Sequence, residues 1–239
     1  MSADFRFKRF AVTQQLSAMK VGTDGVLLGA WTRIEPCHQR VLDVGTGTGV
    51  VALMLAQRSE AWGADVVGVE IDEQSASEAA VNFANSPWND RLAVQCEAVQ
   101  EFCSEEPFDL IVSNPPYFVD SLHSPDAART TARHTTSLSF DTLAACAARL
   151  LTEEGSMAVV LPYDALSAMT LAAARSGLFV VRRCDVRSKA SAGPIRVLME
   201  LGRHPAATVR EELVIHSPSG LLGYSDDYVA LTKDFYLKF

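Results

Sequence analysis

Short runs of apolar residues alternate along the chain with longer segments in which apolar residues recur every three or four positions. The short apolar runs predict strands over 41–44, 65–70, 92–96, 108–113 and 156–161, and the apolar centre of 108–113 indicates a strand that is buried on both faces. The helical spacing predicts helices over 49–58, 72–85, 140–151 and 164–176. Strands that alternate with helices form βαβ units, so we predict an α/β fold with a doubly wound, mostly parallel sheet.

The alternation stops after the last predicted helix, which ends at Gly177. Two more strands are predicted over 179–187 and 195–202, with no helical pattern between them, so we expect an antiparallel final hairpin and seven strands in all. No repeat or linker divides the sequence. We therefore expect a single domain over 1–239, with a core over 41–202 and extensions over 1–40 and 203–239.

Composition limits the class of protein. Hydrophobic residues make up 48% and charged residues 21% of the chain, which is ordinary for a globular protein. No apolar run approaches the roughly 18 residues that a membrane span needs, and the charged N-terminus lacks the apolar core of a secretion signal. The five cysteines form no C-x-x-C pair, which disfavours a zinc site and fits a reducing compartment. We expect a cytoplasmic protein with no membrane span and no metal.

The net charge of −8 disfavours a protein that simply coats nucleic acid. The charge is nevertheless uneven. Residues 60–109 hold twelve acids and one base, whereas residues 175–210 hold eight bases and two acids. Residues 5–10 interleave three bases with phenylalanines. Bases beside aromatics are typical of RNA-binding surfaces, so the N-terminal segment and the 175–210 block are candidate phosphate-binding faces. The alternative is a solvated charged surface.

A glycine-rich turn follows the first predicted core strand. The sequence there is Asp43-Val-Gly-Thr-Gly-Thr-Gly49, with glycines at 45, 47 and 49. Glycine permits a sharp turn and a close approach of the backbone to a ligand, so we expect a nucleotide-type cofactor at this point. Val50 occupies a position where the dinucleotide fingerprint needs a small residue, which disfavours a nicotinamide dehydrogenase. Asp43 would repel phosphates and suits a cationic ligand.

Two further polar positions follow strand ends. Glu70 ends the second core strand, where a carboxylate can accept hydrogen bonds from both hydroxyls of a ribose. The fourth core strand is followed directly by Asn114, Pro115, Pro116 and Tyr117. The prolines fix the backbone and remove two donors, which leaves an amide oxygen and carbonyls as rigid acceptors beside an aromatic ring. Such a pocket suits a planar group that bears an NH2.

Together these motifs resemble the S-adenosylmethionine-dependent methyltransferases that modify exocyclic or amide nitrogens. The resemblance implies a Rossmann-like fold, S-adenosyl-L-methionine as the cofactor, and a methionine site shaped by Gly45, Gly47 and Gly49. It implies that Asp43 lies near the amino or sulfonium group and that Glu70 binds the ribose. The family usually carries an acid for the adenine amino group near the end of the third strand. Ala98 stands at that position here, with Glu97 one residue earlier as the candidate.

Flanking segments narrow the resemblance. Residues 7–10, 20–28, 132–134 and 224–237 are similar to the bacterial tRNA1(Val) adenine-N6 methyltransferases, nearly end to end. This resemblance implies transfer to N6 of a tRNA adenosine in a single-stranded loop, with Asn114 and the Pro115 carbonyl holding the amino group and Tyr117 stacking on the base. The candidate substrate contacts are Arg6, Lys8, Arg9, Lys20, Arg133 and His134.

Other functions remain open from the sequence. An rRNA or DNA adenine or guanine N-methyltransferase would share the central motifs. A protein glutamine N5-methyltransferase would also share them, although those enzymes usually carry a longer helical region than the 42 residues that precede Asp43. A cofactor-binding module without catalysis is the non-enzyme alternative, and the intact Asn114-Pro-Pro-Tyr117 disfavours it.

Overall fold

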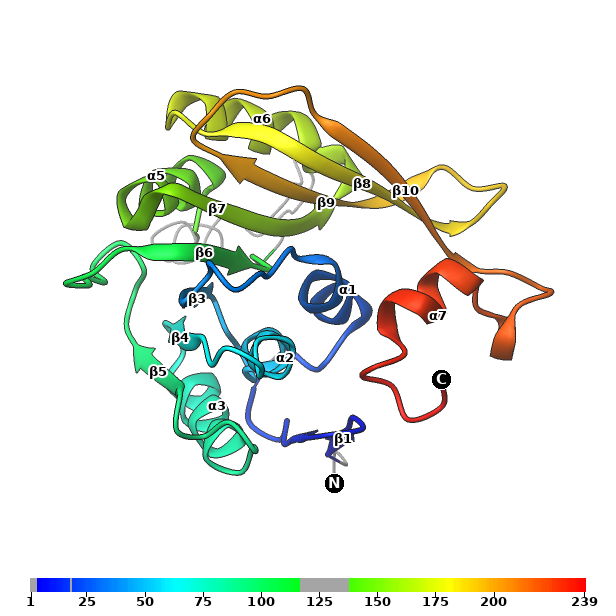
Figure 1. The fold of residues 1–239 in the computed structure, drawn as a ribbon, viewed down its shortest axis with the longest axis horizontal. Helices are drawn as coiled ribbons and strands as arrows, with labels where there is room; N and C mark the ends of the chain where they lie inside the picture. The colour runs from blue at the N-terminus through cyan, green and yellow to red at the C-terminus, as the bar shows by residue number, and fades with distance from the viewer. Residues whose placement is uncertain (1–3, 18, 117–137) are drawn as a thin grey trace, which may run out of the picture.

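The computed structural model of the chain describes residues 4–17, 19–116 and 138–239. Within them, a central sheet has the strand order β10-β8-β9-β7-β6-β3-β4-β5 (Figure 1). Its strands are β3 (Arg40–Val44), β4 (Asp65–Glu70), β5 (Leu92–Cys96), β6 (Phe108–Ser113), β7 (Leu151–Pro162), β8 (Phe179–Lys189), β9 (Pro194–Gly202) and β10 (Val209–His216). Neighbours are parallel except for β9, which is antiparallel to both β7 and β8. The mostly parallel sheet and the antiparallel hairpin are therefore confirmed.

The sheet differs from the predicted one at two places. The seven predicted strands are all present, and β10 adds an eighth that pairs in parallel with β8 at the edge of the sheet. Within β10 only Leu213 and Ile215 are buried, so its apolar signal is too weak to predict a strand. β7 begins at Leu151, directly after the preceding helix, because the chain turns there without a loop.

Helices cover both faces of the sheet (Figure 1). One face packs against α1 (Thr23–Trp31), α2 (Val50–Arg58) and α3 (Glu73–Ala84). The other packs against α5 (Phe140–Leu150) and α6 (Leu166–Arg175), which follows the 3-10 turn η1 (Tyr163–Ala165). Successive side chains of a strand point to opposite faces, so Val41 of β3 joins the first core and Leu42 joins the second.

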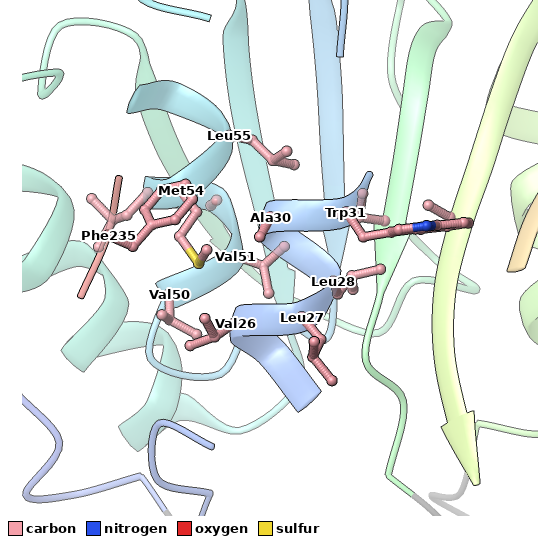
Figure 2. Close-up of a cluster of buried hydrophobic side chains, with 14 of the residues drawn as sticks. Val26, Leu27, Leu28, Ala30, Trp31, Val50, Val51, Met54, Leu55 and Phe235 are labelled. Atoms are coloured by element: carbon pink, nitrogen blue, oxygen red, sulfur yellow. The ribbon is translucent and has the colours of Figure 1, made fainter. Parts of the chain in front are cut away.

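Helix α1 lies in the segment that the sequence pattern assigns to an N-terminal extension. Seven of its nine residues are buried, because it packs between α2 and the sheet. A helix that is apolar on all sides has no amphipathic pattern, which explains why the sequence does not predict it. Figure 2 shows its side chains interleaved with Val50, Val51 and Met54 of α2. The two helices approach closely at Gly29, where a Cβ would lie 2.8 Å from Met54 Sδ.

The two ends of the described chain pack on each other. The short strands β1 (Phe5–Arg6) and β2 (Ala11–Val12) form an antiparallel pair. The helix α7 (Asp226–Thr232) follows the turn η2 (Leu221–Gly223). The rings of Phe7 and Tyr236 stack with their centroids 6.1 Å apart, and the Lys8 amide donates to the Phe235 carbonyl at 2.8 Å. No helix in the described ranges is both long and apolar enough to cross a membrane.

Candidate active site

A cavity of about 640 Å³ opens at the carboxyl ends of β3, β4, β5 and β6. β3 has β4 on one side and β6 on the other, so the order of the strands reverses here. Such a switch point is where open α/β sheets bind ligands, and the volume is typical of a small-molecule site. The wall contains the predicted cofactor positions Asp43, Gly45, Gly47, Glu70 and Glu97 and the predicted acceptor Asn114, whereas the predicted Gly49 is not among the lining residues.

The glycine loop connects β3 to α2. All three glycines have positive φ angles, +70° at Gly45, +55° at Gly47 and +82° at Gly49. Gly49 is the N-cap of α2, and a Cβ there would lie 2.4 Å from Phe83 Cε1, so its requirement for glycine comes from packing against α3. A Cβ on Gly45 or Gly47 would meet no atom within 4 Å. These two glycines therefore leave open space beside the cavity.

Asp43 lines the cavity and is 2% exposed. Its Oδ2 accepts hydrogen bonds from Thr46 Oγ1 at 2.7 Å and from the Ala52 amide at 3.2 Å. Burial raises the pKa of Asp43 to about 7, although the two hydrogen bonds oppose that shift. A cation bound in the cavity would favour the ionised carboxylate.

Glu70 joins the glycine loop to the start of α3. One carboxylate oxygen accepts from the Gly47 amide at 2.9 Å, and the other accepts from the Asp72 amide at 3.0 Å. A carboxylate has about four acceptor sites, so Glu70 keeps capacity for two more donors. Glu97 and Ala98 follow β5 and line the same cavity, half-buried.

The amide that is predicted to accept an amino group comes directly after β6. The Ser113 hydroxyl donates to the Val44 carbonyl at 2.9 Å, which ties the end of β6 to the end of β3. Asn114 and Pro116 line the cavity, and Pro115 is buried behind them. The predicted stacking residue Tyr117 lies outside the described residues, as do Arg133 and His134.

Sequence reasoning missed two buried polar residues of α3. Glu78 is 3% exposed and accepts backbone N–H bonds from Gln15, from Leu16 at 3.0 Å and from Ser17 at 2.9 Å. Asn82 exchanges two hydrogen bonds with the Thr13 backbone and donates to the Thr48 carbonyl in the glycine loop.

These bonds hold residues 13–17, which we call the N-terminal strap, and Ser17 of the strap lines the cavity. One feature of the sequence could have identified Glu78 and Asn82. They lie four residues apart, and each is followed by an apolar residue that is buried in the fold, Ala79 and Phe83.

Three of the four predicted substrate contacts in the N-terminal segment, Lys8, Arg9 and Lys20, have protein partners. The Lys20 ammonium donates to the Gln14 and Ser17 carbonyls, and the Lys8 ammonium donates to the carbonyls of residues 233 and 239. Arg9 forms a bidentate pair with Glu60 at 2.7 and 2.8 Å.

Glu60 follows the carboxyl end of α2, whereas the first residues of α2 line the cavity, so Arg9 is separated from the cavity by the length of that helix. Arg6 is exposed. A role for these residues in RNA binding stays a prediction.

The basic block over 175–210 does not form one continuous basic face. Arg182 pairs with Glu211 at 2.9 Å and Glu200 at 3.6 Å, and its guanidinium stacks on Trp31. Arg183 pairs with Asp185 at 2.6 Å. The charges of these two arginines are therefore neutralised inside the fold.

Comparisons with known proteins place the chain in a family. The family model described as the methyltransferase small domain matches residues 22–174. The tRNA1(Val) (adenine(37)-N6)-methyltransferase of Bacteroides thetaiotaomicron is 45% identical, over 98% of this chain and 97% of its own. The protein of the same name from Tolumonas auensis is 42% identical, over 98% and 97%.

The solved structure of a predicted O-methyltransferase from Agrobacterium tumefaciens has a TM-score of 0.69 at 17% identity, covering 89% of this chain and 96% of that one, and supports the fold alone. Because the sequence likeness is high and nearly end to end, the chain belongs to the methyltransferase small domain family and, within it, to the tRNA1(Val) (adenine(37)-N6)-methyltransferases.

Proposed function

We propose that this chain transfers a methyl group from S-adenosyl-L-methionine to N6 of adenosine 37 in tRNA1(Val). The observation that carries the proposal is the placement of Asn114 in the same cavity as the glycine loop and Glu70. An acceptor for an amino group and a set of groups suited to a nucleoside cofactor therefore share one space. The names of the relatives give the substrate and the position.

The residues of the cavity fit this cofactor. S-adenosyl-L-methionine supplies an electrophilic methyl group on a positively charged sulfur. Five acids line the cavity against two bases, Lys20 and Arg196, so its charge suits a cation better than a pyrophosphate. Glu70 has acceptor capacity for the ribose hydroxyls, and Asp43 would face the positive charge. Glu97 is the candidate for the adenine amino group.

Asn114 would act on the acceptor nitrogen. The lone pair of an adenine N6 is delocalised into the ring, which makes this nitrogen a poor nucleophile. Acceptance of its two hydrogens by the Asn114 side-chain oxygen and the Pro115 carbonyl would draw it toward tetrahedral geometry and stabilise the charge that develops on it. The following prolines and the bond between Ser113 and Val44 keep this acceptor set rigid. No strong base is needed, because the product ammonium is acidic.

The substrate must present an unstacked base. Adenine inside a duplex cannot reach an amide at the bottom of a cavity, whereas a base in a single-stranded loop can be turned out at low cost. Tyr117 would stack on that base. We further propose that residues 1–239 act as one unit in the cytoplasm, where tRNA is modified.

Methyl transfer to a defined RNA tests the proposal. Tritiated S-adenosyl-L-methionine would be supplied with an unmodified tRNA1(Val) transcript and with a matched transcript that carries guanosine at position 37. The protein should label only the first. Asn114→Ala should lower kcat by about two to three orders of magnitude, the cost of losing one preorganised polar partner.

Cofactor affinity and Tm should change little in the same variant. Equal labelling of both transcripts, or full activity per folded molecule in Asn114→Ala, would overturn the assignment.

A further inference from the structure

We infer that the tip of the β8–β9 hairpin, residues 187–196, is the surface that holds the RNA backbone beside the active site. The inference rests on the proposed function, since it places the same tRNA substrate. It is carried by the position of the tip in the sheet, by its charge, and by one residue that links it to the cavity.

The register of the strands places the tip at the end of the sheet where Asn114 lies, which we call the catalytic edge. Ser113, the residue before Asn114, pairs with Val159 of β7. Val160, the next residue of β7, pairs with Leu198 of β9, which in turn pairs with Cys184 of β8, so these three residues lie at one level of the sheet. Because β8 runs in the same direction as β7, its end at Lys189 lies five residues past that level, about 17 Å at roughly 3.3 Å per residue. Figure 1 shows the hairpin projecting beyond the sheet on the side where β6 ends.

The charge of the tip is suited to phosphate. Residues 187–196 contain Arg187, Lys189 and Arg196 and no acid. Lys189 is exposed, and no ion pair joins it to the described part of the chain. Arg187 meets Glu212 at 3.5 Å, but that carboxylate is 65% exposed, and such surface pairs contribute little. Arg187 Nη1 donates to the Ala192 carbonyl at 2.8 Å within the tip, so a phosphate would replace only Glu212, at Nη2, whereas Arg182 deeper in the same strand is well paired.

Arg196 connects the tip to the active site. It lines the cavity, and its Nε donates to Asp24 Oδ2 at 2.9 Å, in the first turn of α1. On the other side of the tip, Lys189 is paired in register with His216 of β10, whose exposed ring stacks on Tyr224 with centroids 5.3 Å apart. Cations next to an accessible aromatic ring are typical of surfaces that follow a single strand. Nucleotides that flank a base held at Asn114 would therefore reach the tip.

Charge reversal at the tip tests the inference. Lys189→Glu and Arg187→Glu would be compared with Arg175→Glu, the matched control. Arg175 is 61% exposed and ends α6, which leads to the amino end of β8 and so to the opposite edge of the sheet.

Each tip variant should raise KM for the tRNA about tenfold, with kcat within twofold and cofactor affinity unchanged. The slope of log affinity against log salt should fall by about 0.7 for each single-strand phosphate that the variant no longer neutralises.

Two controls separate the outcomes. Lys189→Arg keeps the charge and should keep KM, and cofactor affinity measured by calorimetry reports that each variant is folded. An unchanged KM in both tip variants, or an equal rise in Arg175→Glu, would overturn the inference while leaving the proposed function in place. If the unsubstituted protein transfers no methyl group, that result overturns the proposed function. Gel shifts that measure direct tRNA binding by each variant still test the role of the tip in that case.

Discussion

Removal of the Glu78 carboxylate should open the N-terminal strap and weaken cofactor binding. Glu78 touches no group that we assign to the reaction, yet it accepts the backbone N–H groups of Gln15, Leu16 and Ser17. Ser17 forms part of the cavity wall, and its hydroxyl meets Ser75 Oγ at 3.2 Å. In Glu78→Ala the three amides lose their common acceptor, and the wall loses its support.

The magnitude follows from the number of bonds and their burial. A hydrogen bond to a charged group contributes about 1.5–3 kcal/mol, so three bonds set an upper limit of roughly 5–9 kcal/mol. The buried carboxylate loses hydration worth several kcal/mol, and water can reach the three amides once the strap lifts. We therefore expect the strap to open more easily by about 2–4 kcal/mol, which is about 30-fold to several hundred-fold in the opening equilibrium.

Hydrogen exchange of the amides of residues 15–17 reads this equilibrium directly. Their protection should fall by that factor in Glu78→Ala, and the affinity for S-adenosyl-L-methionine should fall by about 10- to 100-fold, which corresponds to about 1.4–2.8 kcal/mol. Glu73→Ala is the control, because Glu73 is an exposed acid on the same helix. The reasoning is refuted if the three amides stay protected, or if Glu73→Ala has the same effect on them.

Three further predictions concern the cavity and the loop that leads into α2. Because burial raises the pKa of Asp43 to about 7, the native state retains a proton that the unfolded chain releases near pH 4. Asp43→Asn should therefore gain stability relative to the unsubstituted protein, by a few kcal/mol, as the pH rises from about 4 to about 7. Urea titrations measure the difference in free energy of unfolding between the two proteins, and a difference that does not change with pH would contradict the burial argument. Gly49→Ala should lose about 2–4 kcal/mol, because its Cβ would meet Phe83 at a positive φ, whereas Gly63→Ala, with a similar φ and open space, should lose about 1 kcal/mol. Denaturant midpoints check this pair, and equal losses would show that packing against Phe83 is unimportant. Asn114→Asp should retain more methyl transfer than Asn114→Ala, since a carboxylate still accepts a hydrogen bond, and an equal loss in kcat would count against that role.

The sequence by itself determined the order of the core elements and the position of the cofactor loop. A strand buried between two helical layers needs an apolar centre, as residues 110–112 give β6, and a turn with three positive φ angles requires the glycines at 45, 47 and 49. These requirements act within a few residues of the chain. They can therefore be recognised without knowledge of what packs against each element.

Tertiary structure alone decided which partner each buried or charged group has. Glu78 binds amides that lie 61–63 residues away in the chain, and Arg9 pairs with an acid 51 residues away. Helix α1 has no amphipathic pattern because α2, β7 and α7, which come from three separate parts of the chain, all pack on it. The eight bases of 175–210 look alike in the sequence, but the direction of β8 places Lys189 at the catalytic edge and Arg175 at the opposite one. Charge is a property of a residue, whereas its location and its neutralisation depend on how distant segments are brought together.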